Sequence, residues 1–417
     1  MIRVNSEIGL LKKVIIHTPD DGIEQVTPDK AVEYLYEDIV YLDRMKKEHQ
    51  VLDQLLKIFI GVENVIDFQD LLTEVCGYDH ARKSLVESVA QFEKNDKLLT
   101  ILLKLSPQHL AYTLITGVLK GSKKIVFSPV SNLIFCRDIG VIINNYLLIT
   151  QANKRARSRE SLLAWHVYHY SKLFAQIHEN KWHISLSENV SELLENIEND
   201  ENEYSIEGGD IMMFGKDHLL IGCSERTHKH AFEKVKEMVF KWNLAKYVAM
   251  IEIPKERYCM HLDTVMTRID EKLCVVYAPL ICEKNVIHTK RYTKGIPEPK
   301  LYSSVKDLLT DIEPDMQLIP CGGGNTPYQE REQWTDGCNL FAIKPGVAVT
   351  YDRNKMTSKA IQKAGYSVYK AEQLIKKIKN GNIEAASIEK TLILVPSNEL
   401  SRARGGTHCL TFPLCRE

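Results

Sequence analysis

The sequence lacks several features that would assign the protein to a particular class. Its ten cysteines include no C-x-x-C pair, so the usual spacing of zinc ligands is absent. No apolar run approaches the roughly 18 residues of a transmembrane helix, and charges interrupt the apolar runs near the start, unlike a signal peptide. Lysine plus arginine total 54 and aspartate plus glutamate total 55, so no excess of positive charge favours nucleic acid or a membrane surface. We therefore expect a cytoplasmic protein with reduced cysteines that binds neither.

The chain of 417 residues repeats one pattern: a β-rich run, a turn, a second β-rich run and then often a helix. The clearest β-rich segments are residues 12–19, 140–150, 210–224, 263–281 and 339–351. Helical periodicity follows several of them, for example in residues 159–177. About five ββα units of this kind predict an α/β fold with a radial repeat, in which each unit packs on its neighbours.

One segment departs from this repeat. Residues 70–122 have helical periodicity almost throughout, with breaks at Pro107 and Gly121. We interpret this segment as an all-helical insertion within a single domain that spans residues 1–417. The β-rich repeats before and after it are then parts of the same body.

Four short stretches place reactive side chains at the ends of predicted strands or in glycine-rich loops. They are residues 132–138 (NLIFCRD), 207–210 (EGGD), 260–264 (MHLDT) and 402–409 (RARGGTHC). In an extended strand, His261 and Asp263 would face the same side, where the carboxylate favours an imidazolium. Glycines before Cys409 suit a thiol nucleophile that a substrate must reach. Each stretch alone has an ordinary alternative, such as a surface ion pair, a loop that caps a strand or a buried cysteine.

Together these stretches supply a thiol, a histidine, several carboxylates and several arginines. Paired carboxylates match the five N–H donors of a guanidinium, so the combination points to a planar, cationic guanidino substrate. The histidine pairs His166/His169 and His228/His230 have no further ligands at metal-binding spacing. We therefore expect no metal and no organic cofactor.

The joint order of these motifs resembles that of the arginine deiminases, within the guanidino-group-modifying superfamily. The matching stretches are residues 132–138, 207–210, 222–227 (GCSERT), 260–264, 331–337 (REQWTDG) and 404–409. Residues 110–118 (LAYTLITGV) also resemble the helical subdomain of arginine deiminases, which agmatine deiminases, dimethylargininases and amidinotransferases lack. The resemblance implies a five-bladed α/β propeller with its active site on the central axis. It also implies a hydrolase of linear amidines that converts L-arginine to L-citrulline and ammonia.

The resemblance assigns catalytic roles to five residues. Cys409 is the nucleophile that forms a covalent S-alkylthiouronium intermediate, and His261 is the general acid and base. Glu207 orients His261, and Asp138 and Asp263 hold the guanidinium. All five belong to the motifs quoted above.

Four further residues match family positions that bind or admit the substrate. Asn132, Arg157 and Arg226 are expected to bind the α-carboxylate, since arginine–carboxylate pairs are the usual chemistry for this task. Arg404, next to the nucleophile loop, is expected to gate the site. By analogy with the family we also expect a homo-oligomer, a dimer or higher, that acts in arginine catabolism.

Two departures from the family pattern keep alternatives open. The family commonly has proline after the Arg-Asp pair, whereas Ile139 and Gly140 follow here, and residues 322–327 (GGGNTP) differ from the usual spacing. One alternative is a related guanidine-modifying enzyme, either a deiminase of a modified arginine or an amidinotransferase. The other is a non-catalytic propeller that binds arginine.

Overall fold

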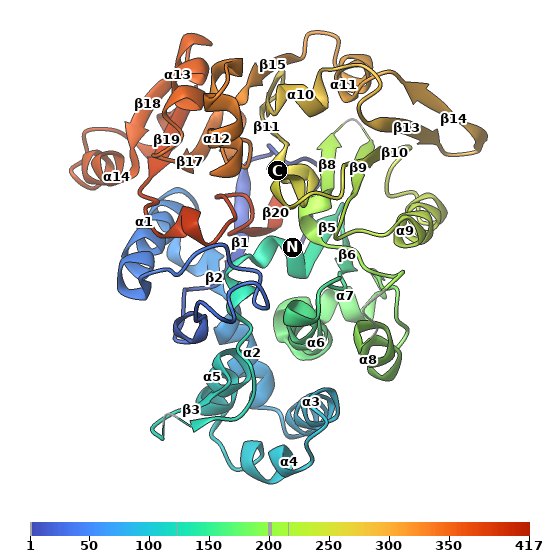
Figure 1. Ribbon diagram of the computed structural model, residues 1–417, viewed down its shortest axis with the longest axis vertical. Coiled ribbons are helices and arrows are strands. Elements are labelled where there is room, and N and C mark those ends of the chain that lie inside the picture. The colour runs from blue at the N-terminus through green and yellow to red at the C-terminus, as the bar shows by residue number, and fades with distance from the viewer. Residues whose placement is uncertain (1, 123, 199–201, 216) are drawn as a thin grey trace.

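Five β-sheets surround a central axis in the computed structural model, which describes residues 2–122, 124–198, 202–215 and 217–417 (Figure 1). We call each sheet with its crossover helix a blade. In every blade two antiparallel strands are followed by a helix and by a strand that joins in parallel. The repeat is therefore ββαβ, one strand longer than the ββα unit predicted from the sequence.

The blades have the following elements in common: an inner strand, a middle strand, a crossover helix and an outer strand. In that order they are β20 (Phe412–Arg416), β1 (Leu11–Ile16), α1 (Leu42–Ile60) and β2 (Val65–Asp67); β5 (Gly140–Ile143), β6 (Tyr146–Ile149), α6 (Arg155–Tyr170) and β7 (His183–Ile184); β8 (Ile211–Gly215), β9 (His218–Cys223), α9 (Lys229–Lys241) and β10 (Tyr247–Glu252); β11 (Met266–Asp270), β12 (Leu273–Val276), α11 (Val305–Ile312) and β15 (Gln317–Pro320); and β16 (Phe341–Lys344), β17 (Val347–Tyr351), α13 (Lys355–Lys363) and β19 (Thr391–Val395).

Additional strands extend two of the blades. The third sheet continues through β13 (His288–Thr293) and β14 (Ile296–Tyr302), and β18 (Ser367–Lys370) flanks β19 in the fifth. The predicted β-rich segment 263–281 was wrong at its end, because residues 278–281 form the short helix α10 (Ala278–Ile281) with a proline in its first turn. The turn expected near residue 216 of the 210–224 hairpin lies outside the described residues.

The two ends of the chain meet in the first blade. Strand β20 pairs antiparallel with β1, with Phe412 opposite Ile15 and Pro413 opposite Val14. Figure 1 shows β20, β5, β8 and β11 around the centre of the molecule. Since β20 begins just after Cys409, this pairing anchors the segment that carries the predicted nucleophile.

The predicted helical segment 70–122 contains four helices, α2 (Phe68–Cys76), α3 (Asp79–Phe92), α4 (Lys97–Leu102) and α5 (Pro107–Thr116). Figure 1 shows them at the periphery, beyond α6. Their buried side chains share one hydrophobic cluster with α6 and the second blade, including Leu110 and Leu162. This shared core favours the interpretation of one domain with an insertion. Within the described ranges, no helix is long and apolar enough to cross a membrane.

Candidate active site

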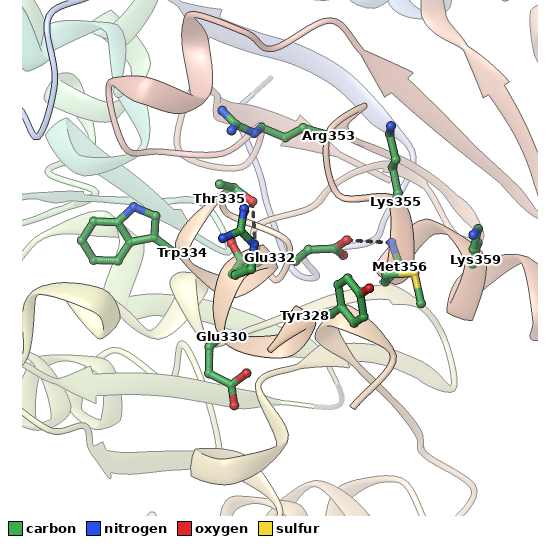
Figure 2. Close-up of a pocket in the computed structure, with 10 residues that line it drawn as sticks. Tyr328, Glu330, Glu332, Trp334, Thr335, Arg353, Lys355, Met356 and Lys359 are labelled. Carbon is green, nitrogen blue, oxygen red and sulfur yellow. Dashed lines mark hydrogen bonds between the residues drawn. The ribbon is translucent and has the colours of Figure 1, made fainter. Parts of the chain in front are cut away.

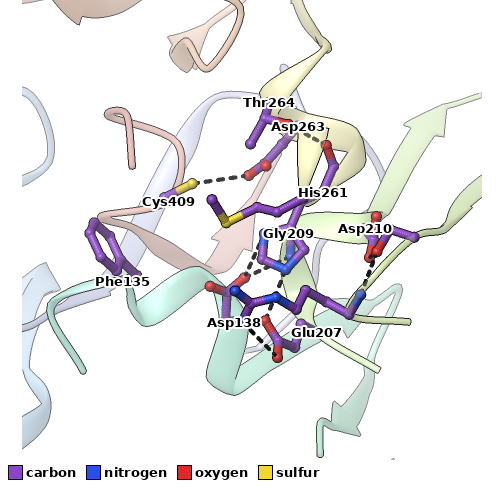
Figure 3. A network of polar contacts seen from close by, with 12 residues as sticks. Phe135, Asp138, Glu207, Gly209, Asp210, His261, Asp263, Thr264 and Cys409 are labelled. Carbon is purple, nitrogen blue, oxygen red and sulfur yellow. Dashed lines mark hydrogen bonds and ion pairs between the residues drawn. The ribbon is translucent and has the colours of Figure 1, made fainter. Parts of the chain in front are cut away.

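Each blade has a polar or thiol residue shortly before its inner strand that lies near the axis. These five residues are Asp138 before β5, Glu207 before β8, Asp263 before β11, Asn339 before β16 and Cys409 before β20. Short 3-10 turns follow or contain three of them, so the chain turns sharply near the axis before those strands begin. Figure 3 shows how four of them lie around one centre with His261. The fold therefore brings residues from the starts of all five inner strands together.

The thiol of Cys409 lies between an amide and a carboxylate. Its Sγ accepts a hydrogen bond from Asn339 Nδ2 at 3.2 Å and lies 3.5 Å from Asp263 Oδ2. Asn339 Oδ1 also accepts the backbone N–H of Cys409 at 3.1 Å. Burial raises the pKa of the Cys409 thiol well above its ordinary value, and the charge of Asp263 raises it further. A cation must therefore enter the site before the thiolate becomes favourable.

A buried chain of polar groups holds Asp263 in place. Asp263 Oδ2 lies 2.8 Å from His408 Nδ1, and His408 Nε2 lies 3.1 Å from Glu7 Oε2. Burial raises the pKa of Glu7, but Arg137 and His408 outweigh it and lower the value to about 2. Glu7 thus stays charged, and the other oxygen of Asp263, Oδ1, is buried with no hydrogen-bond partner among the described residues.

His261 is held by carboxylates in the protonated form. Its Nε2 lies 2.9 Å from Glu207 Oε2, and its Nδ1 lies 3.9 Å from Asp138 Oδ1. Burial lowers the pKa of His261, but Asp138, Glu207 and Asp210 more than compensate and raise it to about 9. A Cβ at Gly209 would stand 2.8 Å from the imidazole ring, so only glycine leaves room for this approach.

The local structure predicted for His261 and Asp263 was wrong. Residues 262–264 form a 3-10 turn rather than an extended strand, so the two side chains do not alternate along a strand. They nevertheless reach the same centre, His261 toward Glu207 and Asp263 toward Cys409. Asp210 Oδ1, from the neighbouring blade, accepts the backbone N–H of Leu262 at 2.9 Å at the start of this turn.

Arg157 is fully occupied by carboxylates. Its Nη1 donates to Asp138 Oδ2 at 2.5 Å and to Glu207 Oε2 at 3.4 Å, and its Nε donates to Glu160 Oε2 at 2.9 Å. Burial lowers the pKa of Arg157, but these three carboxylates together raise it well above its ordinary value. In this structure the guanidinium of Arg157 therefore contacts Asp138, the carboxylate that the sequence analysis assigned to a substrate guanidinium.

Arg226 and Arg404 carry donors that make no hydrogen bond to any described residue, although Arg226 Nε lies 3.9 Å from Glu225 Oε2. Arg226 is buried with its Nη1 3.8 Å from Glu207 Oε1, and its Nε makes no hydrogen bond within the described chain. The guanidinium of Arg404 lies 3.7 Å from the ring centre of Trp334, and its Nε and Nη1 are buried without hydrogen bonds to described residues. Buried donors of this kind are costly unless an anion satisfies them.

Seven of the nine predicted site residues line one closed cavity, namely Asn132, Asp138, Arg157, Arg226, His261, Arg404 and Cys409. Its water-accessible volume is only about 20 Å³. Leu35 closes one wall, and its carbonyl accepts a hydrogen bond from Arg257 Nη2 at 2.6 Å. Asn132 Nδ2 donates to the carbonyl of the preceding Tyr34 at 2.7 Å. A ligand as large as an amino acid can enter only if this segment or Arg404 moves.

Known proteins place the chain in a family. The family model for arginine deiminases matches residues 79–416. An arginine deiminase of Bacillus cereus (strain B4264) is 31% identical over 445 residues, and one of Borreliella burgdorferi (strain ZS7) is 30% identical over 446 residues. Both alignments cover 100% of this chain and 98% of the relative. The chain belongs to the arginine deiminase family. The resemblance inferred from the motifs is therefore confirmed.

Solved structures of more distant proteins share the fold. An amidinotransferase from Microseira wollei has a TM-score of 0.50 at 10% identity, and an inosamine-phosphate amidinotransferase from Streptomyces griseus has 0.50 at 15% identity. Each alignment covers 100% of this chain and 97% of the other. Likeness at this identity concerns the fold alone. With the five sheets around one axis, it confirms the predicted five-bladed α/β propeller.

The departure from the family pattern after Asp138 is compensated locally. The carbonyl of Asp138 accepts a hydrogen bond from Thr150 Oγ1 at 2.7 Å, and its Oδ1 accepts the N–H of Gly209 at 3.0 Å. A Cβ at Gly140 would lie 2.6 Å from the hydroxyl of Tyr168. These contacts, rather than a proline after Asp138, therefore fix the orientation of the Asp138 side chain.

Three members of this arginine deiminase site were missed by the sequence analysis: Asn339, His408 and Glu7. For Asn339 a signal existed, because it precedes the inner strand of the fifth blade as the other four residues precede theirs. His408 is adjacent to Cys409 and could have been considered with it. Nothing local marks Glu7, whose contact with His408 joins residues 401 positions apart.

One group of side chains could in principle hold a metal ion. Among the described residues, ligand atoms of Asp138, Glu207 and His261 lie within 4.8 Å of one another. The same carboxylates already face the guanidinium groups of Arg157 and Arg226. Arg157, Arg226 and the imidazolium of His261 are three positive charges close to this group, and they disfavour a further divalent cation. The carboxylates instead match the donors of a guanidinium.

Proposed function

We propose that the protein hydrolyses L-arginine to L-citrulline and ammonia at Cys409. The observation that carries this proposal is the set of unpartnered buried groups around the thiol. Among the residues that the structure describes, Asp263 Oδ1 accepts no hydrogen bond, and the guanidinium groups of Arg226 and Arg404 have donors that make none. Free arginine has the matching groups, a guanidinium at one end and a carboxylate at the other. The names of the arginine deiminase relatives support the same substrate.

Binding exchanges one guanidinium for another. The substrate guanidinium replaces that of Arg157 on Asp138 and also contacts Asp263, so the carboxylates remain neutralised throughout. Arg157, once released from Asp138, joins Arg226 and Asn132 around the α-carboxylate. The exchange keeps the number of buried charges balanced, which limits its cost.

The first chemical half forms a covalent intermediate. Entry of the cationic guanidinium beside Cys409 favours the thiolate, whose proton leaves to solvent. The sulfur attacks the guanidinium carbon and forms a C–S bond. His261 then protonates one terminal nitrogen, the C–N bond breaks, and ammonia departs. The S-alkylthiouronium group remains on Cys409.

The second half returns the enzyme to its starting state. His261, now neutral, removes a proton from a water molecule that attacks the thiouronium carbon. The C–S bond breaks and releases the thiolate of Cys409, the added hydroxyl group loses its proton to solvent so that citrulline forms, and the thiolate is protonated again once the product leaves. Glu207, 2.9 Å from His261 Nε2, orients the imidazole for both proton transfers.

The test is an assay of purified protein with L-arginine that measures citrulline and ammonia. We expect both products in equal amounts, and none from Cys409→Ala. Cys415→Ala is the matched control, since this half-buried cysteine lies in β20 away from the cavity. Acid quenching followed by mass spectrometry is expected to find an amidine adduct on Cys409. Hydrolysis by Cys409→Ala at the wild-type rate would contradict the covalent route.

The assay also separates hydrolysis from the related reactions. Transfer of the amidino group would require an added amine and would release ornithine without ammonia. A deiminase of modified arginines would turn over methylated arginine faster than arginine. Binding of arginine without product would indicate a non-catalytic role.

We also propose that the protein acts in the cytoplasm as a homo-oligomer. The ten cysteines all have free thiols, which suits a reducing compartment. The oligomer is proposed from the family relationship, and light scattering at several protein concentrations tests it.

A further inference from the structure

A second, larger depression lies outside the catalytic cavity, in the fifth blade. It is formed by α12 (Tyr328–Trp334) and the start of α13 and has a volume of about 740 Å³. Figure 2 shows Arg353, Lys355 and Lys359 along one side and Tyr328 and Glu330 on the other. We call this depression the α12–α13 groove. Its volume falls within the range of roughly 300–1,000 Å³ that small-molecule sites occupy.

The groove contains positive charge that the protein does not neutralise. Four exposed cations line it, Arg331, Arg353, Lys355 and Lys359. Among the described residues none of the four forms an ion pair, whereas most cations around the catalytic cavity do. A cluster of like charges without counterions raises the local concentration of anions and favours one that carries several charges.

The two carboxylates that line the groove, Glu330 and Glu332, accept hydrogen bonds from other groups. Glu332 is buried and accepts the backbone N–H groups of Met356 and Thr357, both at 2.7 Å, at the start of α13. Glu330 Oε1 lies 2.9 Å from both Thr326 Oγ1 and Gln329 Nε2. Among the described residues neither carboxylate forms an ion pair with any of the four cations, and the four cations outnumber the two carboxylates that line the groove.

Exposed aromatic rings accompany the charges. Tyr328 is 48% exposed and Trp334 is 40% exposed, and both line the groove. A large exposed ring beside a basic patch suits a ligand that has a planar or apolar part in addition to its charge. The combination fits a phosphorylated small molecule better than a simple inorganic anion.

The groove contacts the nucleophile loop at two points. Arg353 Nη1 donates to Ser401 Oγ at 2.5 Å, and Ser401 precedes Arg404 by three residues. On the other side, Trp334 stacks on the guanidinium of Arg404, which lines the catalytic cavity. An anion that draws Arg353 away from Ser401 would loosen the loop that has to move when the cavity opens.

We propose that the α12–α13 groove is an effector site for a phosphorylated small molecule, whose binding eases the opening of the catalytic cavity. The proposal rests on the proposed function for its kinetic part, because opening is measured through arginine turnover. Binding to the groove is independent of that activity. The closed, empty cavity is in equilibrium with an open cavity that can bind arginine. An effector that destabilises the closed form therefore increases the apparent affinity for arginine.

Isothermal titration calorimetry of the full-length protein tests the binding with three probes: ATP, pyrophosphate and inorganic phosphate. We expect saturable binding of ATP and pyrophosphate that weakens as salt increases. The double variant Lys355→Glu/Lys359→Glu is expected to weaken it at least about tenfold. The matched control, Lys376→Glu/Lys379→Glu, makes the same charge change on the neighbouring helix α14 (Ala371–Lys379) and is expected to bind as the wild type does.

The kinetic arm measures arginine turnover with and without saturating probe. We expect the KM for arginine to fall about two- to tenfold in the presence of probe, with kcat little changed, and the effect to vanish in the groove variant. If ATP binds more tightly than pyrophosphate, the aromatic rings of Tyr328 and Trp334 contribute to ligand binding. If the two bind equally, the site recognises the polyphosphate group alone. Absence of binding, or equal binding by both double variants, would overturn the site. Binding without a kinetic effect would overturn the effector role, whereas binding to a protein without arginine turnover would overturn only the proposed function.

Discussion

Arg157 Nη1 lies 2.5 Å from Asp138 Oδ2, so the protein's own guanidinium occupies the carboxylate that a substrate guanidinium would need. The same group neutralises Glu160 and Glu207. Burial raises the pKa of Glu160 to about 7 even with Arg157 present. In the proposed function Arg157 thus acts as a mimic of the substrate guanidinium that stabilises the empty site, and we expect turnover to require its displacement.

Removing this mimic tests the relationship through stability. Arg157→Ala removes a cation that three buried carboxylates share, although Glu207 keeps His261 and Arg226 beside it. We expect it to lower the free energy of unfolding by about 3–5 kcal/mol. Guanidinium at low millimolar concentration is expected to raise the melting temperature of this variant more than equal NaCl does. Arg155→Ala, at an exposed neighbouring arginine, is the control and is expected to melt near the wild type. Equal effects of the two salts would show that no guanidinium subsite exists.

The pKa of His261 predicts how stability depends on pH. The value is raised from 6.5 to about 9 in the folded protein, so the contribution of the imidazolium is fully present below about pH 6.5 and is lost as pH rises through about 9. As pH rises from about 6.5 to about 9, the melting temperature of the wild type is expected to fall further than that of His261→Gln. His230→Gln serves as the control on α9 and is expected to follow the wild-type curve. Parallel curves for wild type and His261→Gln would contradict a charged His261.

Arginine turnover is expected to depend on the same proton. In the proposed mechanism the imidazolium is the acid that releases ammonia, so kcat/KM, which reports the free enzyme, is expected to fall as pH rises through about 9. The pH dependence of kcat/KM for arginine measures this directly. An unchanged kcat/KM well above that pH would remove His261 from the role of general acid.

Asn339 is expected to act as a positioning residue for the thiol. Its Nδ2 donates to Cys409 Sγ at 3.2 Å and to the carbonyl of Asp263 at 3.1 Å. A hydrogen bond to a charged group such as a thiolate contributes about 1.5–3 kcal/mol. We therefore expect Asn339→Ala to lower kcat by about 10- to 100-fold, with a smaller change in KM. The pH dependence of alkylation by iodoacetamide is expected to shift upward in the same variant.

A second variant separates this role from a purely structural one. Asn339→Asp keeps the acceptor for the backbone N–H groups of His408 and Cys409 but replaces the donor with a negative charge. We expect it to fold and to raise the pH of alkylation further than Asn339→Ala does. An unshifted alkylation profile in both variants would limit Asn339 to holding the loop.

Arg226 is expected to distinguish arginine from its decarboxylated form. Its buried Nε has no hydrogen-bond partner among the described residues, and bidentate arginine–carboxylate pairs are strong. Arg226→Gln is expected to raise the KM for arginine at least about tenfold while changing that for agmatine little. Lys229→Gln, an exposed residue paired with Glu252 on the same blade, is the control. Equal loss on both substrates would assign Arg226 to holding Glu207 instead.

Much of the fold could be predicted because its signals are local. Turn residues between β-rich runs mark the hairpins, for example Asn144 between β5 and β6, where φ is +54°. Helical spacing after those hairpins marks the crossovers, and Ser106 and Pro107 mark the start of α5. The sequence did not predict the outer strand of each blade. A whole crossover helix separates this strand from its pairing partner along the chain, so no turn residues mark the pair.

The sequence by itself determined the propeller repeat, the reactive residue types and the family, because each motif is short and its chemistry depends on residue identity. Only the tertiary structure decided how those residues pair. It placed Arg157 on Asp138, linked Glu7 through His408 to Asp263, and set Asn339 against the thiol. It also closed the catalytic cavity and left the cations of the α12–α13 groove without ion pairs to any described residue. The contacts of Asn339 with Cys409 and of His408 with Asp263 join different blades, and their geometry follows from how the blades close around one axis.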